Sequence, residues 1–423
     1  MTSRIALISD HASPLATIGG IDAGGQNIAV AELAKELARL GYWVDVFTRL
    51  DSPSVPDVVH WQPRVRVIHV AAGPPKYIPK EHLLPVMDDF AEKMAQFIQR
   101  ENSTYRVIHA HFFMSGVVAM RLRQLLGIPF VITFHALGAV RQLCQGTKDG
   151  FPAERTAIEK QLVQKASGVV ALCPQDAADL QTLYGANPAK LTIIPNGYNP
   201  TDFFPLDQGL ARASAGLDPE EPVILQLGRL VPRKGIDNVV RALAVLPPIN
   251  GRKARLLVVG GESATPDPVL TPEIGRLQQL ATSLGVADQV TFIGSRARSQ
   301  LRTYYSAADV FVTTPWYEPF GITPLESMAC GTPVVGSSVG GIKHTVIPGV
   351  TGYLVPPESP KLLADQLAVV LGNENLRQRM GKAAVKHVQA GYTWKHVAQQ
   401  TADLYDLVCT GRTRVGIRMK AAH

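Results

Sequence analysis

Short, strongly apolar runs alternate with longer helical stretches along most of the chain. The runs of the first half are Ile5–Ser9, Trp43–Thr48, Val107–Ala110, Phe130–Thr133, Gly168–Leu172 and Leu191–Pro195. The second half repeats the pattern with Val223–Leu227, Leu256–Gly260, Val290–Ile293, Val310–Thr313 and Pro333–Gly336. Apolar runs separated by long helical connections are typical of parallel strands buried on both faces. The pattern therefore predicts an α/β protein with two doubly wound, Rossmann-like parallel sheets facing a cleft.

The periodic pattern is interrupted between Asn196 and Pro222, where Asn-Gly, Asn-Pro and Asp-Pro pairs occur. The chain has 423 residues, which favours two domains. We expect a first domain over 1–200 and a second domain over 201–390. Apolar residues at helical spacing in Trp394–Val408 predict that 391–423 forms a helix crossing back to the first domain, followed by a basic tail.

Composition narrows the class of protein. Hydrophobic residues make up 46% and charged residues 18%, which is a globular composition. The net charge of +7 suits an anionic ligand, but no basic stripe interleaved with aromatic residues indicates nucleic-acid binding. The four cysteines are widely spaced in apolar neighbourhoods, which predicts reduced structural thiols. Without a signal peptide or an apolar run long enough to span a membrane, we expect a cytoplasmic protein.

A glycine-rich loop follows the first predicted strand. It runs from Gly19 to Asn27 and includes Gly24 and Gly25, and an amphipathic helix follows it. Paired glycines let the backbone approach a phosphate or a sugar, and a helix N-terminus adds partial positive charge. A plain flexible turn remains the alternative, because the loop is not a dinucleotide-binding fingerprint.

A second candidate loop follows the strand Val223–Leu227. Here Arg229 and Lys234 come after a strand end with glycines on either side, which suits an anion. A solvated basic loop is the alternative interpretation.

The most informative segment runs from Thr313 to Pro333, where a strand leads through a Pro- and Gly-containing loop into a helix. We predict Thr323 as N-cap of that helix, so that Glu326 completes a Thr-x-x-Glu capping box. Glu318 alone is compatible with an exposed loop acid. Against these structural explanations, two carboxylates eight positions apart around such a loop can bind a sugar nucleotide.

These motifs resemble those of the retaining, GT-B-fold glycosyltransferases called glycosyl transferase group 1. Glu318 to Glu326 matches the E-x7-E signature, Arg229 and Lys234 match a second signature, and the Gly24-Gly25 loop matches a third. The resemblance covers nearly the whole chain in the expected order. Within the family it is nearest to sucrose-phosphate synthases and to the inositol-phosphate N-acetylglucosaminyltransferases of the mycothiol pathway, on the segments 24–27, 76–83, 109–116 and 133–138.

The resemblance implies transfer of a hexosyl group from a nucleotide diphosphate sugar, expected to be UDP-linked, to a phosphorylated sugar or cyclitol, with no further cofactor. It implies that 1–200 is the acceptor-binding domain and 201–390 the nucleotide-sugar-binding domain. Arg229 and Lys234 would stabilise the departing diphosphate. Glu326 would hold the ribose, and Glu318 with the backbone of Phe320, Gly321 and Ile322 the donor sugar and phosphate. His135 would contact a donor-sugar hydroxyl. For the acceptor, Asn27 would receive a hydroxyl, and Lys76 and Arg155 would bind the phosphate.

Alternatives stay open at this point. Arg155 could instead form an ion pair with Glu154 or Glu159. His109 and His111 share a face of a strand, but no third ligand is evident, so we predict packing and no metal. A nucleotide-sugar epimerase and a non-enzymatic sugar-nucleotide-binding protein are the two rival functions on the same scaffold.

Overall fold

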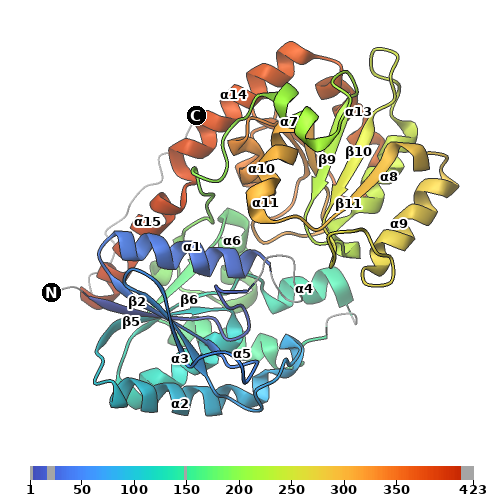
Figure 1. Cartoon of the computed structure of the whole chain (residues 1–423). Coiled ribbons are helices and arrows are strands. Elements are labelled where there is room, and N and C mark those ends of the chain that lie inside the picture. Colours follow the sequence, from blue (N-terminus) through green and yellow to red (C-terminus); the bar gives the residue numbers. More distant parts are fainter. Residues whose placement is uncertain (1–2, 17–23, 147–149, 411–423) are drawn as a thin grey trace. The chain divides into compact units, whose positions relative to one another are not determined.

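The computed structural model describes residues 3–16, 24–146 and 150–410 (Figure 1). Within these residues the chain divides into two compact units. The first unit contains residues 3–15, 26–146, 150–195 and 395–410, and the second contains residues 16, 24–25 and 196–394. Each unit has one sheet with helices around it, which confirms the predicted fold class.

The sheet of the first unit has eight strands in the order β3-β4-β2-β1-β5-β6-β7-β8. Neighbouring strands are parallel except for β3 and β4. The strands are β1 (Arg4–Ile8), β2 (Trp43–Arg49), β3 (Val58–Gln62), β4 (Val65–Val70), β5 (Tyr105–His111), β6 (Phe130–Thr133), β7 (Gly168–Ala171) and β8 (Leu191–Ile193). All but β3 and β4 were predicted from apolar runs.

The antiparallel hairpin β3–β4 was missed because its turn carries no glycine or asparagine. Val59 pairs with Val67, and the chain reverses at Pro63 and Arg64. Arg64 has a φ of 65°, a left-handed conformation that usually selects glycine, asparagine or aspartate. The hairpin signal is therefore absent from the sequence even though the turn geometry is present.

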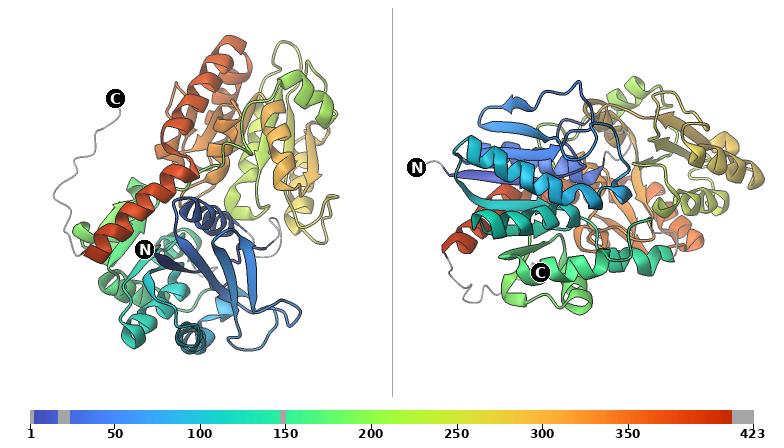
Figure 2. Two further views of the ribbon diagram at one scale, coloured as in Figure 1. Left: turned by 60° about the vertical axis from the view of Figure 1, so that its left-hand side comes forward. Right: turned by 90° about the horizontal axis from the view of Figure 1, so that it is seen from below.

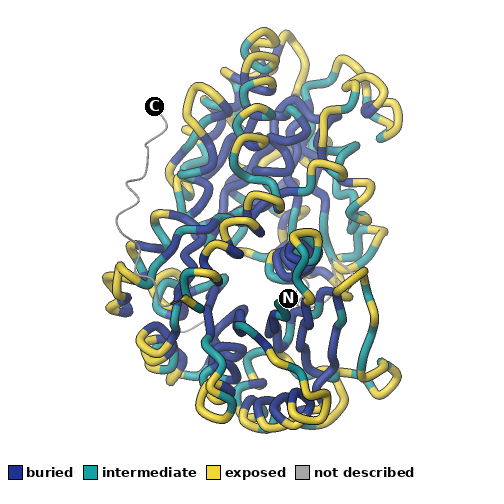
Figure 3. Tube along the Cα trace, turned by 90° about the vertical axis from the view of Figure 1, so that its left-hand side faces the viewer, coloured by how far each residue is buried: buried dark blue, intermediate teal, exposed yellow. Residues whose placement is uncertain are grey.

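Helices cover both faces of this sheet, as Figures 1 and 3 show, and the buried residues line the strands and the inward helix faces. The helices are α1 (Gly25–Arg39), α2 (Met87–Arg100), α3 (Phe113–Leu126), α4 (Gly138–Gln145), α5 (Arg155–Lys165), α6 (Pro174–Tyr184) and α15 (Trp394–Thr410). Short 3-10 turns are η1 (Lys80–His82), η2 (Leu84–Val86) and η4 (Pro188–Lys190). Since β1, β5, β6 and β7 are parallel neighbours, the segments that follow them meet at one edge of the sheet.

The last helix, α15, joins the first unit although it follows the second in sequence (Figure 2). Tyr405 lies with its hydroxyl 2.8 Å from Nδ1 of His109, and Arg106 and Asp406 form an ion pair at 2.7 Å. A buried tyrosine and an ion pair thus hold the helix against β5. The predicted basic tail, with Arg412, Arg414, Arg418 and Lys420, lies outside the described residues.

The sheet of the second unit has six parallel strands in the order β11-β10-β9-β12-β13-β14. They are β9 (Val223–Leu227), β10 (Arg255–Val259), β11 (Val290–Gly294), β12 (Val310–Thr313), β13 (Val334–Ser337) and β14 (Gly352–Val355). Its helices are α7 (Gln208–Ala215), α8 (Ile236–Val245), α9 (Pro272–Ser283), α10 (Arg298–Ala307), α11 (Ile322–Ala329), α12 (Ile342–Thr345), α13 (Pro360–Leu371) and α14 (Glu374–Gly391), with 3-10 turns η5 (Pro232–Lys234) and η6 (Ala287–Gln289). Only the short edge strand β14 was missed.

All four cysteines are free thiols. Cys173 and Cys330 are buried, as predicted, and Cys409 is half-buried. Cys144 is exposed, contrary to the apolar surroundings that were predicted, because residues 142–144 form the outward face of α4, while Ala139 and Val140 pack against the core.

Candidate functional site

Two loops of the second unit leave the carboxyl ends of the neighbouring strands β9 and β12 and are fastened to each other. Thr314 Oγ1 donates to the carbonyl of Gly235 at 2.7 Å, and the N–H of Trp316 donates to the carbonyl of Arg233 at 3.0 Å. Gly235 has a φ of 63°, and a Cβ at this position would lie 2.0 Å from the carbonyl oxygen of Thr314. Only glycine fits there. The junction fixes the basic loop 228–235 against the loop that contains Glu318.

Lys234 and Glu318 form an ion pair inside this junction, in which Nζ donates to Oε2 of the carboxylate. Their side chains are 19% and 14% exposed, and Arg233 Nη1 lies 3.9 Å from the same carboxylate. Burial lowers the pKa of Lys234. Burial would raise the pKa of Glu318, but Lys234 and Arg233 outweigh it and hold that pKa below its usual value. The carboxylate of Glu318 is therefore ionised near neutral pH.

Three cations gather around one carboxylate at this position. Arg229, Arg233 and Lys234 all act electrostatically on Glu318. Arg233, Lys234 and Glu318 are largely shielded from water, whereas Arg229 is exposed. Such a preorganised charge suits a diphosphate or another dianion.

The glycine pair Gly24-Gly25 lies beside this basic loop, within the second unit. A Cβ on Gly24 would be 3.8 Å from Cζ of Arg229, and one on Gly25 would be 3.7 Å from Cδ1 of Ile322. The structure thus brings Gly24, Gly25, Arg229 and Ile322 together, as expected for one site. Residues 19–23 of the same predicted loop lie outside the described residues.

The loop from Glu318 to Gly321 rests on a second glycine pair that the sequence analysis missed. The N–H of Gly341 donates to the carbonyl of Glu318 at 3.3 Å. Gly340 has a φ of 44°, and a Cβ there would lie 1.7 Å from the same carbonyl oxygen. Phe320 is buried, and Gly321 has a φ of 92° and begins α11. The Gly-Gly pair after β13 was the available sequence signal, since it permits this close backbone approach.

Glu326 is a buried acid on α11, with 2% of its surface exposed. Its carboxylate accepts from the hydroxyl of Tyr305 at 3.1 Å and pairs with Arg298 Nη1 at 2.8 Å. Burial raises the pKa of Glu326 in spite of the arginine. The guanidinium of Arg298 also lies 4.7 Å from the ring of Phe203. Arg298, on α10, carried no motif and was not foreseen.

The predicted capping box is wrong. Gly321, not Thr323, is the N-cap of α11, so Thr323 lies inside the first turn and Glu326 is not three residues from the cap. The left-handed conformation of Gly321 starts the helix two residues earlier than the Thr-Pro pair indicates. A capping role therefore does not explain the presence of Glu326 in α11.

In the first unit, three histidines line up across the carboxyl ends of β5 and β6. His109 lies with Nδ1 2.8 Å from the hydroxyl of Tyr405 and Nε2 2.8 Å from Thr133 Oγ1. His111 Nδ1 lies 2.9 Å from Nε2 of His135, and adjacent rings are stacked. Burial lowers the pKa of His109 and of His135 to about 3. All three are therefore uncharged imidazoles at neutral pH, which suits hydrogen bonding to a hydroxyl better than proton supply.

The backbone at this edge is strained. His135 has a φ of 57° and Phe112, after β5, a φ of 82°. Neither residue adopts such angles readily, and strain of this kind collects at functional sites. The packing of His109 and His111 is as predicted, and no group of three potential metal ligands is present among the residues that the structure describes.

The predicted acceptor residues also lie in the first unit. Asn27 is buried near the start of α1, where its Nδ2 donates to the carbonyl of Ser13 at 3.0 Å. Its neighbour Gln26 donates to Ser9 Oγ at 3.1 Å and to the carbonyl of His111 at 3.3 Å. These bonds join the start of α1 to the ends of β1 and β5.

Arg155 is 1% exposed and forms the ion pair with Glu159 that was the alternative prediction, at 2.8 Å. Its Nη2 donates to the carbonyl of Ala136 at 2.5 Å, and its guanidinium lies 4.5 to 4.9 Å from three phenyl rings, those of Phe112, Phe113 and Phe151. Nη1 is buried and has no hydrogen-bond partner among the described residues. Arg155 thus has a structural role at the start of α4, and phosphate binding by it stays a prediction.

Lys76 is exposed on the segment that leads from β4 to α2. Its carbonyl accepts a hydrogen bond from Arg49 Nη2, and its own N–H donates to the carbonyl of Pro74 at 2.8 Å. Arg49, at the end of β2, was not foreseen, because it is far from this segment in sequence and belongs to no motif.

No helix within the described ranges is long and apolar enough to cross a membrane.

Known proteins resemble the chain along nearly its whole length. The family described as Glycosyltransferase Family 4 matches residues 23–202, and Glycosyl transferases group 1 matches residues 207–387. Two relatives named D-inositol 3-phosphate glycosyltransferase, from Corynebacterium diphtheriae and Kribbella flavida, are each 38% identical to it over 410 and 409 residues. These alignments cover 96% and 95% of this chain and 95% of each relative.

Solved structures agree with this likeness. The sucrose-phosphate synthase of Thermosynechococcus elongatus matches with a TM-score of 0.88 and 36% identity, over 97% of this chain and 100% of that one. Anabaena HepE, solved in complex with UDP and glucose, matches with a TM-score of 0.73, over 96% of this chain and 99% of its own. Its identity of 21% shows a common fold alone.

Proposed function

The chain belongs to the glycosyl transferases group 1 family and is a glycosyltransferase, and from this premise we propose that it moves a hexosyl group from a nucleotide diphosphate sugar to a phosphorylated sugar or cyclitol, with retention of configuration. The observation that carries the donor half is the gathering of three cations around Glu318. Arg229 and Lys234 are placed to stabilise the diphosphate as it departs. We expect uridine as the nucleoside.

The proton of the attacking hydroxyl passes to the departing diphosphate, so the protein needs no strong base. The low pKa of His135, about 3, agrees with this assignment, because an imidazole of such low basicity can hydrogen-bond a donor-sugar hydroxyl but is a poor base. Glu326 holds the ribose. Its carboxylate offers about four lone-pair sites, of which the hydroxyl of Tyr305 occupies one, while Oε1 is paired with Arg298 but accepts no hydrogen bond from the described residues.

The acceptor half rests on the relatives together with Lys76. The relatives are named after inositol 3-phosphate and sucrose-phosphate, so a phosphate occurs in the substrate or product of both kinds of enzyme. Lys76 is exposed and its main chain is held by Arg49, which makes it a fixed point charge for a phosphate. Lys80, at the start of η1, lies on the same segment with a side chain 20% exposed and is tested beside it.

The experiment compares phosphorylated acceptors with their neutral parents. Transfer from UDP-sugars is measured to inositol 3-phosphate, fructose 6-phosphate and the dephosphorylated forms, with release of nucleoside diphosphate as the readout. We expect release only with acceptor, and a strong preference for the phosphorylated forms. Conversion of the donor alone would indicate an epimerase, for which the comparisons give no support, and binding without turnover would indicate a regulator.

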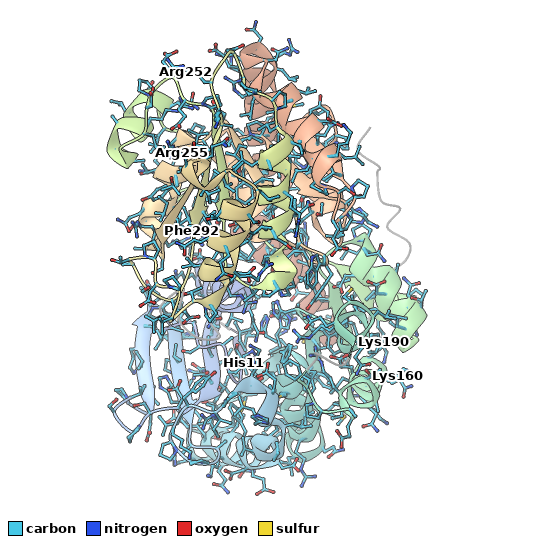
Figure 4. The ribbon with its side chains drawn as sticks, turned by 90° about the vertical axis from the view of Figure 1, so that its right-hand side faces the viewer. His11, Lys160, Lys190, Arg252, Arg255 and Phe292 are labelled. Carbon is cyan, nitrogen blue, oxygen red and sulfur yellow. The ribbon has the colours of Figure 1, made fainter. Side chains whose placement is uncertain are left out.

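Variants locate the phosphate contact. Lys76→Ala and Lys80→Ala are compared with Lys160→Ala, an exposed lysine on α5 that Figure 4 shows on the outer surface of the first unit. We expect Lys76→Ala to raise the KM of phosphorylated acceptors and to leave neutral ones unchanged. Equal use of neutral and phosphorylated acceptors by the wild type would refute the phosphate acceptor but leave the glycosyltransferase standing.

A further inference from the structure

Residues 71–76, between β4 and η1, are held in place mainly by side chains from elsewhere in the first unit. Arg49 reaches across from the end of β2 and donates to three carbonyls of this segment. The Nη1 of Arg49 lies 3.4 Å from the carbonyl of Ala72 and 2.8 Å from that of Pro74, and Nη2 donates to the carbonyl of Lys76. One guanidinium therefore fixes three alternate residues at once.

The other end of the segment is held independently by α2. Asp89 accepts from the N–H of Gly73 at 3.0 Å, and Lys93 Nζ donates to the carbonyl of Ala71 at 2.5 Å. Asp89 and Lys93 also pair with each other at 2.9 Å. Both ends of the segment thus contact secondary structure, and among the described residues it is Arg49 whose side chain binds the end that includes Lys76.

Arg49 itself is 5% exposed, and it forms no ion pair with a carboxylate of the described residues, although Asp51 and Asp10 act on it electrostatically. Burying a guanidinium without such a partner is costly unless its donors are satisfied in another way. Here the donors are satisfied by the carbonyls of the segment, so the arginine and the segment require each other. The prolines at 74 and 75 stiffen the chain further, since each fixes its own φ.

We infer that Arg49 is a positioning residue for the acceptor, which sets acceptor affinity by fixing the backbone from which Lys76 extends. The inference rests on the proposed function, because it takes Lys76 to contact the acceptor. Arg49 does not touch the acceptor in this account. It removes the conformational freedom that the segment would otherwise lose on binding.

The test uses two substitutions of Arg49 in the full-length enzyme. Arg49→Met keeps an apolar stem but loses all donors, and Arg49→Lys keeps a charge that can reach one or two carbonyls. We expect Arg49→Met to raise the acceptor KM about tenfold, as for loss of one charge-assisted hydrogen bond, with kcat and the donor Kd within about twofold. Arg49→Lys should restore part of this loss.

The matched control is Asp89→Asn, which weakens the other end of the same segment. It should leave the acceptor KM within about twofold, because it does not touch the carbonyl of Lys76. In a double-mutant cycle, Arg49→Met should add little to Lys76→Ala, since the two act through one contact.

The inference is overturned if Arg49→Met changes donor and acceptor KM alike, if it lowers the thermal midpoint alone, or if Asp89→Asn has the same effect on acceptor KM. If Arg49→Met does not fold, Arg49→Lys gives the same comparison. The proposed function is tested separately, by measuring whether the wild-type enzyme prefers phosphorylated to neutral acceptors.

Discussion

Replacing Lys234 with alanine is expected to lower turnover by about a hundredfold, because it removes one preorganised positive charge from the site of the departing diphosphate. The loss corresponds to about 3 kcal/mol of transition-state stabilisation. Substrate binding should change less than turnover, since the charge on the diphosphate grows as the bond to the sugar breaks.

The same substitution should also destabilise the second unit. Glu318 is 14% exposed and would lose its hydrogen-bonded cation, leaving Arg233 at 3.9 Å as the next partner. Removing one member of a buried pair costs about 3–5 kcal/mol when nothing replaces it. With Arg233 and partial solvent access remaining, we expect about 2 kcal/mol, which lowers Tm by about 4–8 °C for a unit of this size.

A double variant separates the two effects. Lys234→Ala with Glu318→Gln removes both charges, so the carboxylate is no longer left without its lysine. We expect most of the lost thermal stability to return while turnover stays at least as low as in the single variant. Turnover is measured at saturating donor and stability by thermal unfolding without ligand. Near wild-type turnover in Lys234→Ala, or recovery of turnover in the double variant, would refute the electrostatic role.

Three further outcomes are expected. Glu326→Gln should fold normally and keep its bond to Tyr305 but bind the nucleotide sugar much more weakly; calorimetry that finds an unchanged donor Kd would make the residue structural. Because burial lowers the pKa of His109 to about 3, the unfolded chain takes up a proton below pH of about 6.5 that the folded chain does not. The contribution of His109 to the free energy of unfolding should fall by up to about 1.4 kcal/mol per pH unit from there toward lower pH, and His111 and His135, whose pKa values burial also lowers, add to the total slope. Urea unfolding between pH 7.5 and 5 measures that slope, and His109→Gln should reduce it. Transfer activity should persist in excess EDTA, and complete loss in the chelator would show that a metal ion takes part.

The fold could be predicted from the sequence because whole strands are buried. A strand covered on both faces must be apolar throughout, so Val223–Leu227, Phe130–Thr133 and Val310–Thr313 were predicted with the bounds that the structure gives. Edge elements have no such requirement. The β3–β4 hairpin turns at a left-handed Arg64, and β14 is a short edge strand, so neither left a clear pattern.

Candidate site residues could be named from the sequence because strand ends and glycine-rich loops mark where chemistry sits. Arg229, Lys234 and Glu318 were predicted as parts of one site, and the structure brings them together. The contacts that each carboxylate or guanidinium makes could not be predicted from the sequence. Glu326 pairs with Arg298 from another helix, and Arg155 is enclosed by three phenyl rings.

The sequence by itself determined the two parallel sheets, the strands at their centres and the loops at the carboxyl ends, because hydrophobic burial and turn chemistry act over a few neighbouring residues. Only the tertiary structure decided the long-range pairings: Lys234 with Glu318, Tyr405 with His109, and Arg49 with the backbone at residues 72–76. These join residues tens or hundreds of positions apart. Their energies depend on distance and burial in the folded chain, and neither quantity can be derived from a local sequence pattern.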